Sequence, residues 1–151
     1  MDEKQLAQYI RLFHKSVYRL AYSYVRNAAD ADDVCQEAFV RLYERKSGFD
    51  SDEGCRAWLF RVTINLSISL LRKSRMTEEL DESIPAEEPT GGEIAEAVAK
   101  LPPKYRTAIH LFYYENCSVK EIARITGCSV SCITTRLERA RRLLREILES
   151  E

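Results

Sequence analysis

Apolar residues recur every three or four positions through most of the chain, which is the spacing of one face of an α-helix. Over residues 4–26 these positions are Leu6, Tyr9, Ile10, Phe13, Val17, Leu20, Ala21 and Tyr24. A second series over residues 30–44 comprises Val34, Ala38, Phe39 and Leu42. A third over residues 55–74 comprises Trp58, Leu59, Val62, Leu66 and Leu70. The pattern predicts three amphipathic helices that share one core, a bundle of about 75 residues near the lower size limit for independent folding.

Local signals predict where these helices begin and end. Asp30 stands where the N-cap of the second helix is expected, and Asp33 follows where carboxylates suit the helix dipole. The stretch from Ser47 to Gly54, SGFDSDEG, is typical of a loop. Asn65 lies among aliphatic neighbours in the third helix, so we expect it to be buried and to need hydrogen-bond partners.

Residues 93–116 predict two further short helices. The first carries Ile94, Ala97, Val98 and Leu101. Pro102 stops this helix, and Pro103 suits the first turn of the next one. We expect the second helix to end at Asn116 and to be packed by Tyr105, Ala108, Ile109, Phe112 and Tyr113.

The stretch from Ser118 to Arg145 predicts two helices joined by a tight turn. Ser118 and Glu121 have the spacing of a capping box. Gly127 supplies a residue that adopts positive φ freely, and Ser129 offers a second N-cap. The second helix has an apolar stripe of Val130, Ile133, Leu137, Ala140, Leu144, Ile147 and Leu148. Its other side carries Ser131, Thr134, Thr135, Arg139, Arg142 and Arg145. This is the design of a helix-turn-helix, in which the start of the second helix enters the major groove and arginines behind it hold phosphates.

Charge is distributed in blocks, although the 151 residues have a net charge of only −1. Residues 45–75 carry seven basic and three acidic residues, and residues 100–151 carry ten and six. Residues 76–99 carry eight acidic residues and no basic one. Two basic blocks on either side of an acidic one suggest two nucleic-acid contacts.

The sequence predicts an all-α chain of two small helical domains. The segment 76–92, MTEELDESIPAEEPTGG, combines prolines, glycines and acids, and it cannot bury enough apolar area to order itself. We therefore expect a three-helix domain over 1–75, a flexible acidic linker over 76–92, and a helix-turn-helix domain over 93–151.

The remaining composition indicates a cytoplasmic protein without a metal or cofactor. No run approaches 18 apolar residues, and the N-terminus MDEKQLAQYI lacks the pattern of a signal peptide. The five cysteines form no CxxC pair, which favours buried free thiols in a reducing compartment. A zinc site is conceivable, but its spacing matches no common framework; its ligands would be His110, Cys117, Cys128 and Cys132.

Three stretches match the motifs of one known family in order and spacing. DADDVCQEAFVRLYE at 30–44 is similar to the family's region 2 pattern. WLFRVTINLSISLLRK at 58–73 looks like its promoter-melting helix, with Trp58, Leu59, Arg61, Asn65 and Arg72 in matching places. Residues 101–144 resemble region 4 in LPPKYR, the S-x-x-EIA run and the RLxRAR ending. The sequence therefore resembles the extracytoplasmic-function (ECF) sigma factors of bacterial RNA polymerase. It departs from many members where Ser131-Cys132-Ile133-Thr134 replaces Gly-Thr-Val-Lys, which leaves the −35 sequence open.

The resemblance implies a factor without catalytic residues that lends promoter recognition to core RNA polymerase. The implied polymerase-binding residues are Asp33, Gln36, Glu37 and Arg41. The loop over 47–55 and the third helix would bind the −10 element, through Arg61, Val62, Asn65, Arg72 and Lys73. The second helix of the helix-turn-helix would bind the −35 element, through Ser131, Cys132, Thr134, Thr135, Arg136, Arg139 and Arg142. Trp58 could stack on an extruded base, although its helical phase favours the core. The linker would pass through the polymerase interior or serve as a solvated tether.

The implied partners are core polymerase, promoter DNA and an anti-sigma factor. An alternative is a helix-turn-helix regulator that acts alone and dimerises to reach two half-sites. Asn65 and the basic helix around it count against that alternative, because a plain regulator does not need them. An enzyme has little support, because His14 and His110 stand alone on predicted helices without a paired base or nucleophile.

Overall fold

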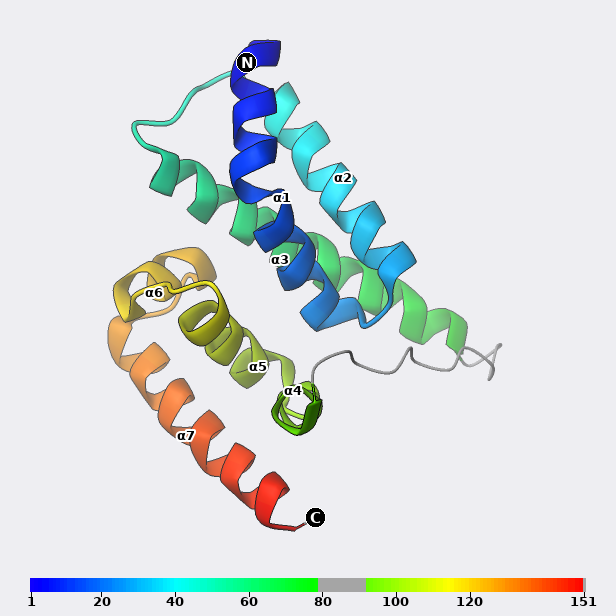
Figure 1. The fold of residues 1–151 in the computed structure, drawn as a ribbon, viewed down its shortest axis with the longest axis vertical. Coiled ribbons are helices and arrows are strands. Elements are labelled where there is room, and N and C mark those ends of the chain that lie inside the picture. The colour runs from blue at the N-terminus through cyan, green and yellow to red at the C-terminus, as the bar shows by residue number, and fades with distance from the viewer. Residues whose placement is uncertain (79–91, 151) are drawn as a thin grey trace. The chain divides into compact units, whose positions relative to one another are not determined.

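The computed structural model describes residues 1–78 and 92–150 of the chain (Figure 1). Every regular element in these two ranges is a helix, which confirms the predicted all-α class. The chain divides into two compact units, Met1–Glu87 and Glu88–Glu151, which we call the N-terminal unit and the C-terminal unit. Most of the predicted linker, residues 79–91, lies outside the described residues.

The N-terminal unit is a three-helix bundle of α1 (Glu3–Val25), α2 (Ala28–Glu44) and α3 (Asp52–Glu78). Each helix packs against the other two, and α3 passes behind α1 in Figure 1. The largest fully buried side chains of the bundle are Val17, Leu20, Leu42, Leu59 and Phe60. The third helix begins earlier and ends later than the predicted 55–74, so that residues 76–78 continue α3 rather than begin a linker.

The connection between α1 and α2 has a different cap from the predicted one. Arg26 ends α1 in the left-handed conformation with φ of 62°. Asn27 is the N-cap of α2, and its side-chain oxygen accepts a hydrogen bond from the backbone N–H of Asp30 at 2.8 Å. Asp30 itself lies in the first turn, where its carboxylate accepts a 2.8 Å hydrogen bond from the Asn27 amide. The prediction of Asp30 as the cap was wrong because the helix begins three residues earlier: Asn27 caps it, and the Ala31 N–H already donates to the Asn27 carbonyl at 3.1 Å.

The face that α3 buries also differs from the predicted stripe. Its buried residues are Cys55, Leu59, Phe60, Thr63, Ile64 and Ser67. Four predicted core residues are only partly buried: Trp58, Val62, Leu66 and Leu70. Thr63 is compatible with the core because its hydroxyl donates to the backbone carbonyl of Leu59 at 2.6 Å. Thr63 and Ser67 are both completely buried, so the face of α3 that packs against α1 and α2 is not the more apolar one.

The C-terminal unit contains α4 (Gly92–Ala99), α5 (Pro103–Ile109), the π-helical turn η1 (His110–Tyr114), α6 (Val119–Thr126) and α7 (Val130–Glu149). Helix α7 packs against α4, α5 and α6. The π-turn adds a residue to the helical turn and shifts the phase of the side chains beyond it. Ala108 and Ile109 are buried as predicted, but Tyr113 is 52% exposed and Phe112 is half-buried.

The helix-turn-helix has the predicted local structure. Both halves of the capping box form: the Glu121 N–H donates to the Ser118 hydroxyl at 3.1 Å, and the Ser118 N–H donates to the Glu121 carboxylate at 3.3 Å. Gly127 ends α6 with φ of 75°, and Ser129 caps α7. The predicted apolar stripe was wrong at one position, since Val130 is 49% exposed. Val130 is the first residue of α7, before the helix meets its neighbours.

Candidate nucleic-acid and protein interfaces

The start of α7 presents hydroxyl groups and cations on one side. The Ser129 hydroxyl accepts a hydrogen bond from the Cys132 N–H at 3.0 Å and so fixes where the helix begins. Of the seven predicted −35 residues, four are exposed: Ser131, Thr134, Arg139 and Arg142. The other three are partly buried: Cys132, Thr135 and Arg136. The Thr134 hydroxyl donates to the Val130 carbonyl at 3.0 Å, which occupies its proton and leaves its lone pairs as acceptors.

Five of these seven residues line one hollow, which we call the α5–α7 hollow. They are Ser131, Cys132, Thr135, Arg136 and Arg139, and the wall is completed by Ser129, Lys104 and Tyr105. Lys104 and Tyr105 were missed at the sequence level, because they belong to the LPPKYR motif at the start of α5 and are far from α7 in sequence. Arg142 lies on a separate surface with Glu138, Arg141 and Arg145.

The predicted −10 residues lie on the solvent side of α3. Arg61, Asn65, Arg72 and Lys73 are exposed, and Val62 is partly buried. Arg61, Asn65 and Arg72 are spaced so that they fall within about 40° of one another around the helix axis. The expectation that Asn65 is buried was wrong, because the face of α3 that enters the core is the one with Thr63 and Ser67. An exposed amide between two arginines is free of the desolvation cost that a buried one would carry.

The loop before α3 is held by an aromatic and cationic cluster. The Arg45 guanidinium lies 4.2 Å from the Phe49 ring centroid and 5.2 Å from that of Trp58. The Arg45 Nε donates to the Ser47 carbonyl at 2.9 Å. Phe49 also contacts Tyr9 edge-on, with centroids 6.3 Å apart. Trp58 is therefore neither a core residue nor an open stacking platform, because Phe49 and Arg45 cover part of its ring.

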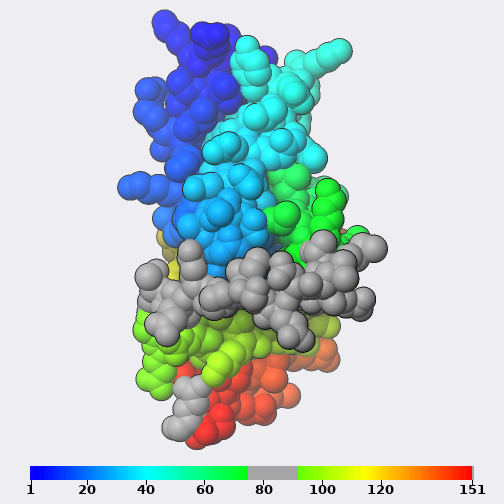
Figure 2. All heavy atoms as spheres, turned by 90° about the vertical axis from the view of Figure 1, so that its right-hand side faces the viewer, coloured from blue at the N-terminus to red at the C-terminus, as the bar shows by residue number. Residues whose placement is uncertain are grey.

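The outer face of α2 carries the four predicted polymerase-binding residues, all of them exposed: Asp33, Gln36, Glu37 and Arg41. Figure 2 shows α2 in light blue and cyan on the face of the N-terminal unit turned toward the viewer. The Arg41 Nε and the Glu37 Oε1 are 3.2 Å apart, and both side chains are about half exposed. A pair this exposed contributes about 0.5 kcal/mol or less to stability. Glu37 and Arg41 can therefore exchange this ion pair for contacts with another protein at little cost to the stability of the fold.

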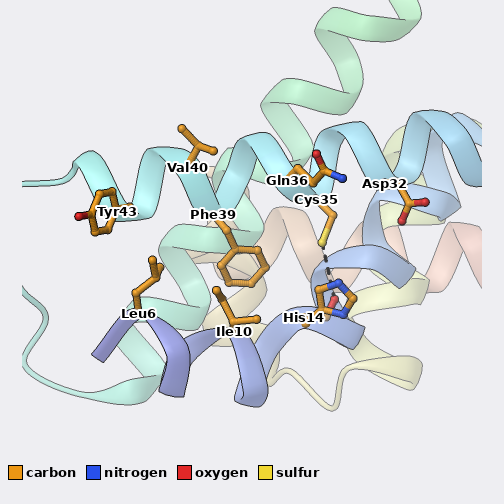
Figure 3. Close-up of a pocket in the computed structure, with 9 residues that line it drawn as sticks. All are labelled: Leu6, Ile10, His14, Asp32, Cys35, Gln36, Phe39, Val40 and Tyr43. Atoms are coloured by element: carbon orange, nitrogen blue, oxygen red, sulfur yellow. Dashed lines mark hydrogen bonds between the residues drawn. The ribbon is translucent and has the colours of Figure 1, made fainter. Parts of the chain in front are cut away.

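An apolar hollow of about 460 Å³ lies between α1 and α2, beside this polar face (Figure 3). We call it the α1–α2 hollow. Leu6, Ile10, Phe39, Val40 and Tyr43 form its apolar end, and His14, Asp32, Cys35 and Gln36 form the other. Val40 and Tyr43 are 48% and 47% exposed. Burial, and secondly the charge of Asp32, raise the pKa of the Cys35 thiol to about 11. The sequence pattern missed this hollow because Val40 and Tyr43 flank the predicted core stripe of α2.

The C-terminal unit has its own apolar hollow where α4, η1 and the end of α7 meet, which we call the α4–α7 hollow. Its apolar lining includes Ile94, Val98, Ile109, Tyr113, Tyr114, Leu144 and Leu148. Arg141 stands at its edge, where its Nε donates to the Tyr113 hydroxyl at 2.8 Å. The shift of phase at η1 creates this surface, because it turns Tyr113 and Tyr114 outward.

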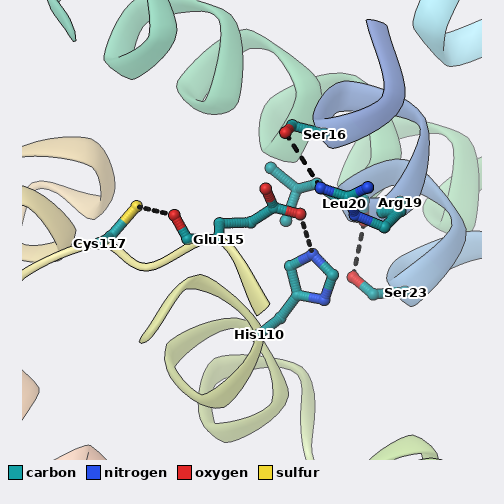
Figure 4. Close-up of polar contacts among 7 residues, drawn as sticks. All are labelled: Ser16, Arg19, Leu20, Ser23, His110, Glu115 and Cys117. Atoms are coloured by element: carbon teal, nitrogen blue, oxygen red, sulfur yellow. Dashed lines mark hydrogen bonds and ion pairs between the residues drawn. The ribbon is translucent and has the colours of Figure 1, made fainter. Parts of the chain in front are cut away.

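The residues proposed for a zinc site have other surroundings. His110 Nε2 lies 3.3 Å from the Glu115 carboxylate, and the Cys117 thiol donates to the Glu115 carbonyl at 3.9 Å (Figure 4). Cys117 is buried, whereas Cys128 and Cys132 are partly exposed, contrary to the expectation of buried thiols. Across residues 1–78 and 92–150, no three His, Cys, Asp or Glu side chains gather as a metal site would require.

We expect a chelator to leave the melting temperature of the protein unchanged. A structural zinc ion contributes directly to folding, so its removal would lower the melting temperature by several degrees or more. Thermal unfolding monitored by circular dichroism, with and without excess chelator, measures this. A drop that added zinc restores would show that Cys117, Cys128 and Cys132 hold metal after all.

The described helices include none that is both long enough and apolar enough to span a lipid bilayer.

His14, the other histidine weighed for catalysis, is exposed on α1 and stacks on Phe39 with ring centroids 6.4 Å apart.

Comparison with known proteins relates both units to transcription initiation. Residues 9–77 match the family model described as sigma-70 region 2, and residues 91–144 match that described as sigma-70, region 4. The ECF RNA polymerase sigma factor SigW of Bacillus subtilis (strain 168) is 30% identical over 97% of this chain and 90% of its own length. The RNA polymerase sigma factor SigV of the same organism is 33% identical over 89% of this chain and 85% of its own length.

Two solved structures are similar over nearly the whole chain. The sigma factor RpoE from Bartonella quintana, crystallised with the anti-sigma factor NepR, has a TM-score of 0.80 and 25% identity, covering 97% of this chain and 98% of that one. CnrH, in complex with the cytosolic domain of CnrY, has a TM-score of 0.77 and 28% identity, covering 99% and 91%. A helical bundle that resembles region 2, followed by a helix-turn-helix unit that resembles region 4, defines a sigma factor of the sigma-70 class. Because the ECF sigma factor SigW is 30% identical over 97% of this chain, the chain belongs to the ECF sigma factors.

Proposed function

We propose that this alternative sigma factor, which directs promoter recognition and transcription initiation by RNA polymerase, divides the two tasks of promoter contact between its units. Residues 1–75 bind core polymerase and the −10 element, residues 93–151 bind the −35 element, and the acidic segment 76–92 connects them. The observation that supports the proposal most directly is that the chain has both surfaces. Helix α3 exposes Arg61, Asn65 and Arg72 on one face, and the capped α7 presents hydroxyls and arginines. The chain supplies recognition and no catalysis, since bond formation belongs to the polymerase.

At the −35 element, the first turns of α7 read bases and the later arginines hold the backbone. Ser131, Thr134, Thr135 and Arg136 lie near the helix start, which is the part that reaches base edges in helix-turn-helix docking. Arg139 and Arg142 follow on exposed positions, where they can neutralise phosphates. Cys132 lines the α5–α7 hollow with Ser131, Thr135 and Arg136, so it belongs to the same surface as the base-reading residues.

At the −10 element, α3 supplies cations for the backbone and one amide for a base. Arg61, Arg72 and Lys73 provide the positive charge, and Val62 offers apolar contact beside it. The Asn65 side chain carries two donors and one acceptor, so it can pair with an edge of a base taken out of the duplex stack. Extrusion costs a few kcal/mol, which such contacts offset.

Core polymerase binds the outer face of α2 through Asp33, Gln36, Glu37 and Arg41. The α1–α2 hollow extends this face, because Gln36 belongs to both. Polar residues on α2 would set the register of the partner, and the exposed apolar side chains beside them would supply buried area.

An anti-sigma factor is the expected regulator, acting in the cytoplasm where polymerase and promoter DNA are found. Support comes from RpoE and CnrH, which were solved with the anti-sigma factor NepR and with the cytosolic domain of CnrY, respectively. The α1–α2 and α4–α7 hollows are apolar and exposed, so they are suitable surfaces for amphipathic helices of such a partner.

A reconstitution experiment tests the proposal. The purified chain is mixed with core polymerase, the complex is isolated by pull-down, and run-off transcription is measured on a genomic promoter library. We expect stable association and transcripts from a subset of promoters that core polymerase alone does not use. Tight and specific duplex binding by the free chain, with no effect on polymerase, would instead favour the regulator that acts alone.

Reversing the charges of Glu37 and Arg41 should weaken binding to core polymerase roughly tenfold or more. The double variant Glu37→Arg with Arg41→Glu is the sharpest form, because it can keep the ion pair while it reverses each charge that a partner meets. Both side chains are half exposed, so we expect a change in stability under about 0.5 kcal/mol.

Affinity is measured by titrating labelled variants with core polymerase, with circular dichroism as the control for folding. Lys4→Glu on α1 is a comparison variant, since it reverses one charge outside the α2 face. Unchanged affinity in a folded double variant would remove this face of α2 from the docking surface.

A further inference from the structure

The α5–α7 hollow concentrates positive charge without a matching acid. Lys104, Arg136 and Arg139 all line it, and none of its eight lining residues is acidic. Within the part of the chain that the structure describes, none of the three cations pairs with a carboxylate. Like charges gathered on one concave surface repel one another, and an anion placed between them removes that cost. The hollow is therefore matched to a negatively charged group.

Lys104 is held at the rim by a fixed piece of backbone. Pro102 and Pro103 begin α5, and the Thr107 hydroxyl donates back to the Pro103 carbonyl at 2.8 Å. The Arg106 guanidinium ties the same helix to the Ala99 carbonyl at 3.2 Å. The Lys104 ammonium lies 5.1 Å from the Tyr105 ring centroid, so a partly buried ring supports an exposed charge.

We propose that Lys104 binds a phosphate of the DNA backbone that flanks the −35 element, with the Tyr105 ring supporting its side chain. The proposal rests on the proposed −35 role of α7. Ser131 and Thr135, at the start of α7, line the same hollow as Lys104. When the start of α7 lies in the major groove, the sugar-phosphate backbone at the edge of that groove therefore passes along the hollow. A lysine at this place is a point charge on a flexible stem, which suits a phosphate and carries no base preference.

This contact joins the LPPKYR segment to the DNA-binding surface. The segment is the start of α5, and α5 packs directly against α7. The −35 surface then has cations on two elements, Lys104 on α5 and Arg139 and Arg142 on α7, so the binding orientation is fixed by more than the recognition helix.

The test uses holoenzyme formed from core polymerase and the full chain, with a fluorescent promoter duplex recovered in the run-off selection. We expect Lys104→Ala to weaken binding three- to tenfold on every promoter tested, without changing the ranking of −35 sequences. Loss of one phosphate contact should lower the slope of log affinity against log salt by about 0.9. Lys104→Arg should restore most of the affinity, and Thr135→Ala should change the ranking instead.

A neutral phosphate identifies the contact directly. Methylphosphonate is substituted one position at a time along both strands beside the −35 element. One substitution should weaken wild-type holoenzyme and have no further effect on Lys104→Ala, whereas Lys100→Ala, which changes a lysine outside the hollow, should respond like wild type. An unchanged salt slope in Lys104→Ala, or full additivity with every methylphosphonate, would overturn the contact. Failure of the proposed function looks different, because wild-type holoenzyme would then ignore the −35 sequence altogether.

Discussion

Asn65→Ala should allow the closed promoter complex to form and should block opening at the −10 element. Asn65 is exposed on α3 between Arg61 and Arg72, so removing its amide leaves the cationic face intact. The lost hydrogen bonds to an extruded base are worth about 1–3 kcal/mol, by analogy with a good bidentate base contact, which is about five- to 150-fold in the population of the open complex. Permanganate reactivity of the −10 thymines measures opening, and a mobility shift measures the closed complex.

Ser69→Ala is the matched control for this experiment. Ser69 is exposed one turn further along the same side of α3, and its removal should leave opening unchanged. Because Asn65 is exposed, its substitution should change the free energy of unfolding by less than about 0.5 kcal/mol. Normal opening in Asn65→Ala together with loss of −35 discrimination would mean that the roles of the two units are assigned the wrong way round.

Features that depend on neighbours in sequence could be predicted, because short-range chemistry decides them. The Ser118–Glu121 capping box, the left-handed Gly127 and the Ser129 cap all use partners within four residues. The same holds for Pro103 at the start of α5. The cap of α2 was missed because Asn and Asp are both good N-cap residues, Asn27 and Asp30 lie nearly one turn apart, and the choice depends on how α1 ends at Arg26.

Features that depend on packing could not be predicted from spacing. The run from Trp58 to Phe60 is apolar on both sides of α3, and only contact with α1 and α2 selects the side with Thr63 in the core. The π-turn after Ile109 has no signal in the apolar pattern, yet it turns Tyr113 toward solvent. The α5–α7 hollow joins Lys104 to residues some 30 positions later, which no periodicity within one helix can indicate.

The buried face of α3 is where we expect a substitution to have the largest effect on stability. Phe60→Ala should destabilise the N-terminal unit by about 3–5 kcal/mol, since Phe60 is completely buried and truncation leaves a cavity. A domain of this size has little stability to lose, so we expect partial or complete unfolding at ambient temperature. Leu59 and Leu66 of α3 provide a matched pair. Leu59→Ala should lower the free energy of unfolding by about 2–5 kcal/mol, and Leu66→Ala, at a partly buried position, should lower it clearly less. Trp58 is the single tryptophan of the chain, so its fluorescence during urea unfolding reports on the N-terminal unit alone. Equal costs at Leu59 and Leu66, or a mild Phe60→Ala, would show that α3 buries the more apolar face after all.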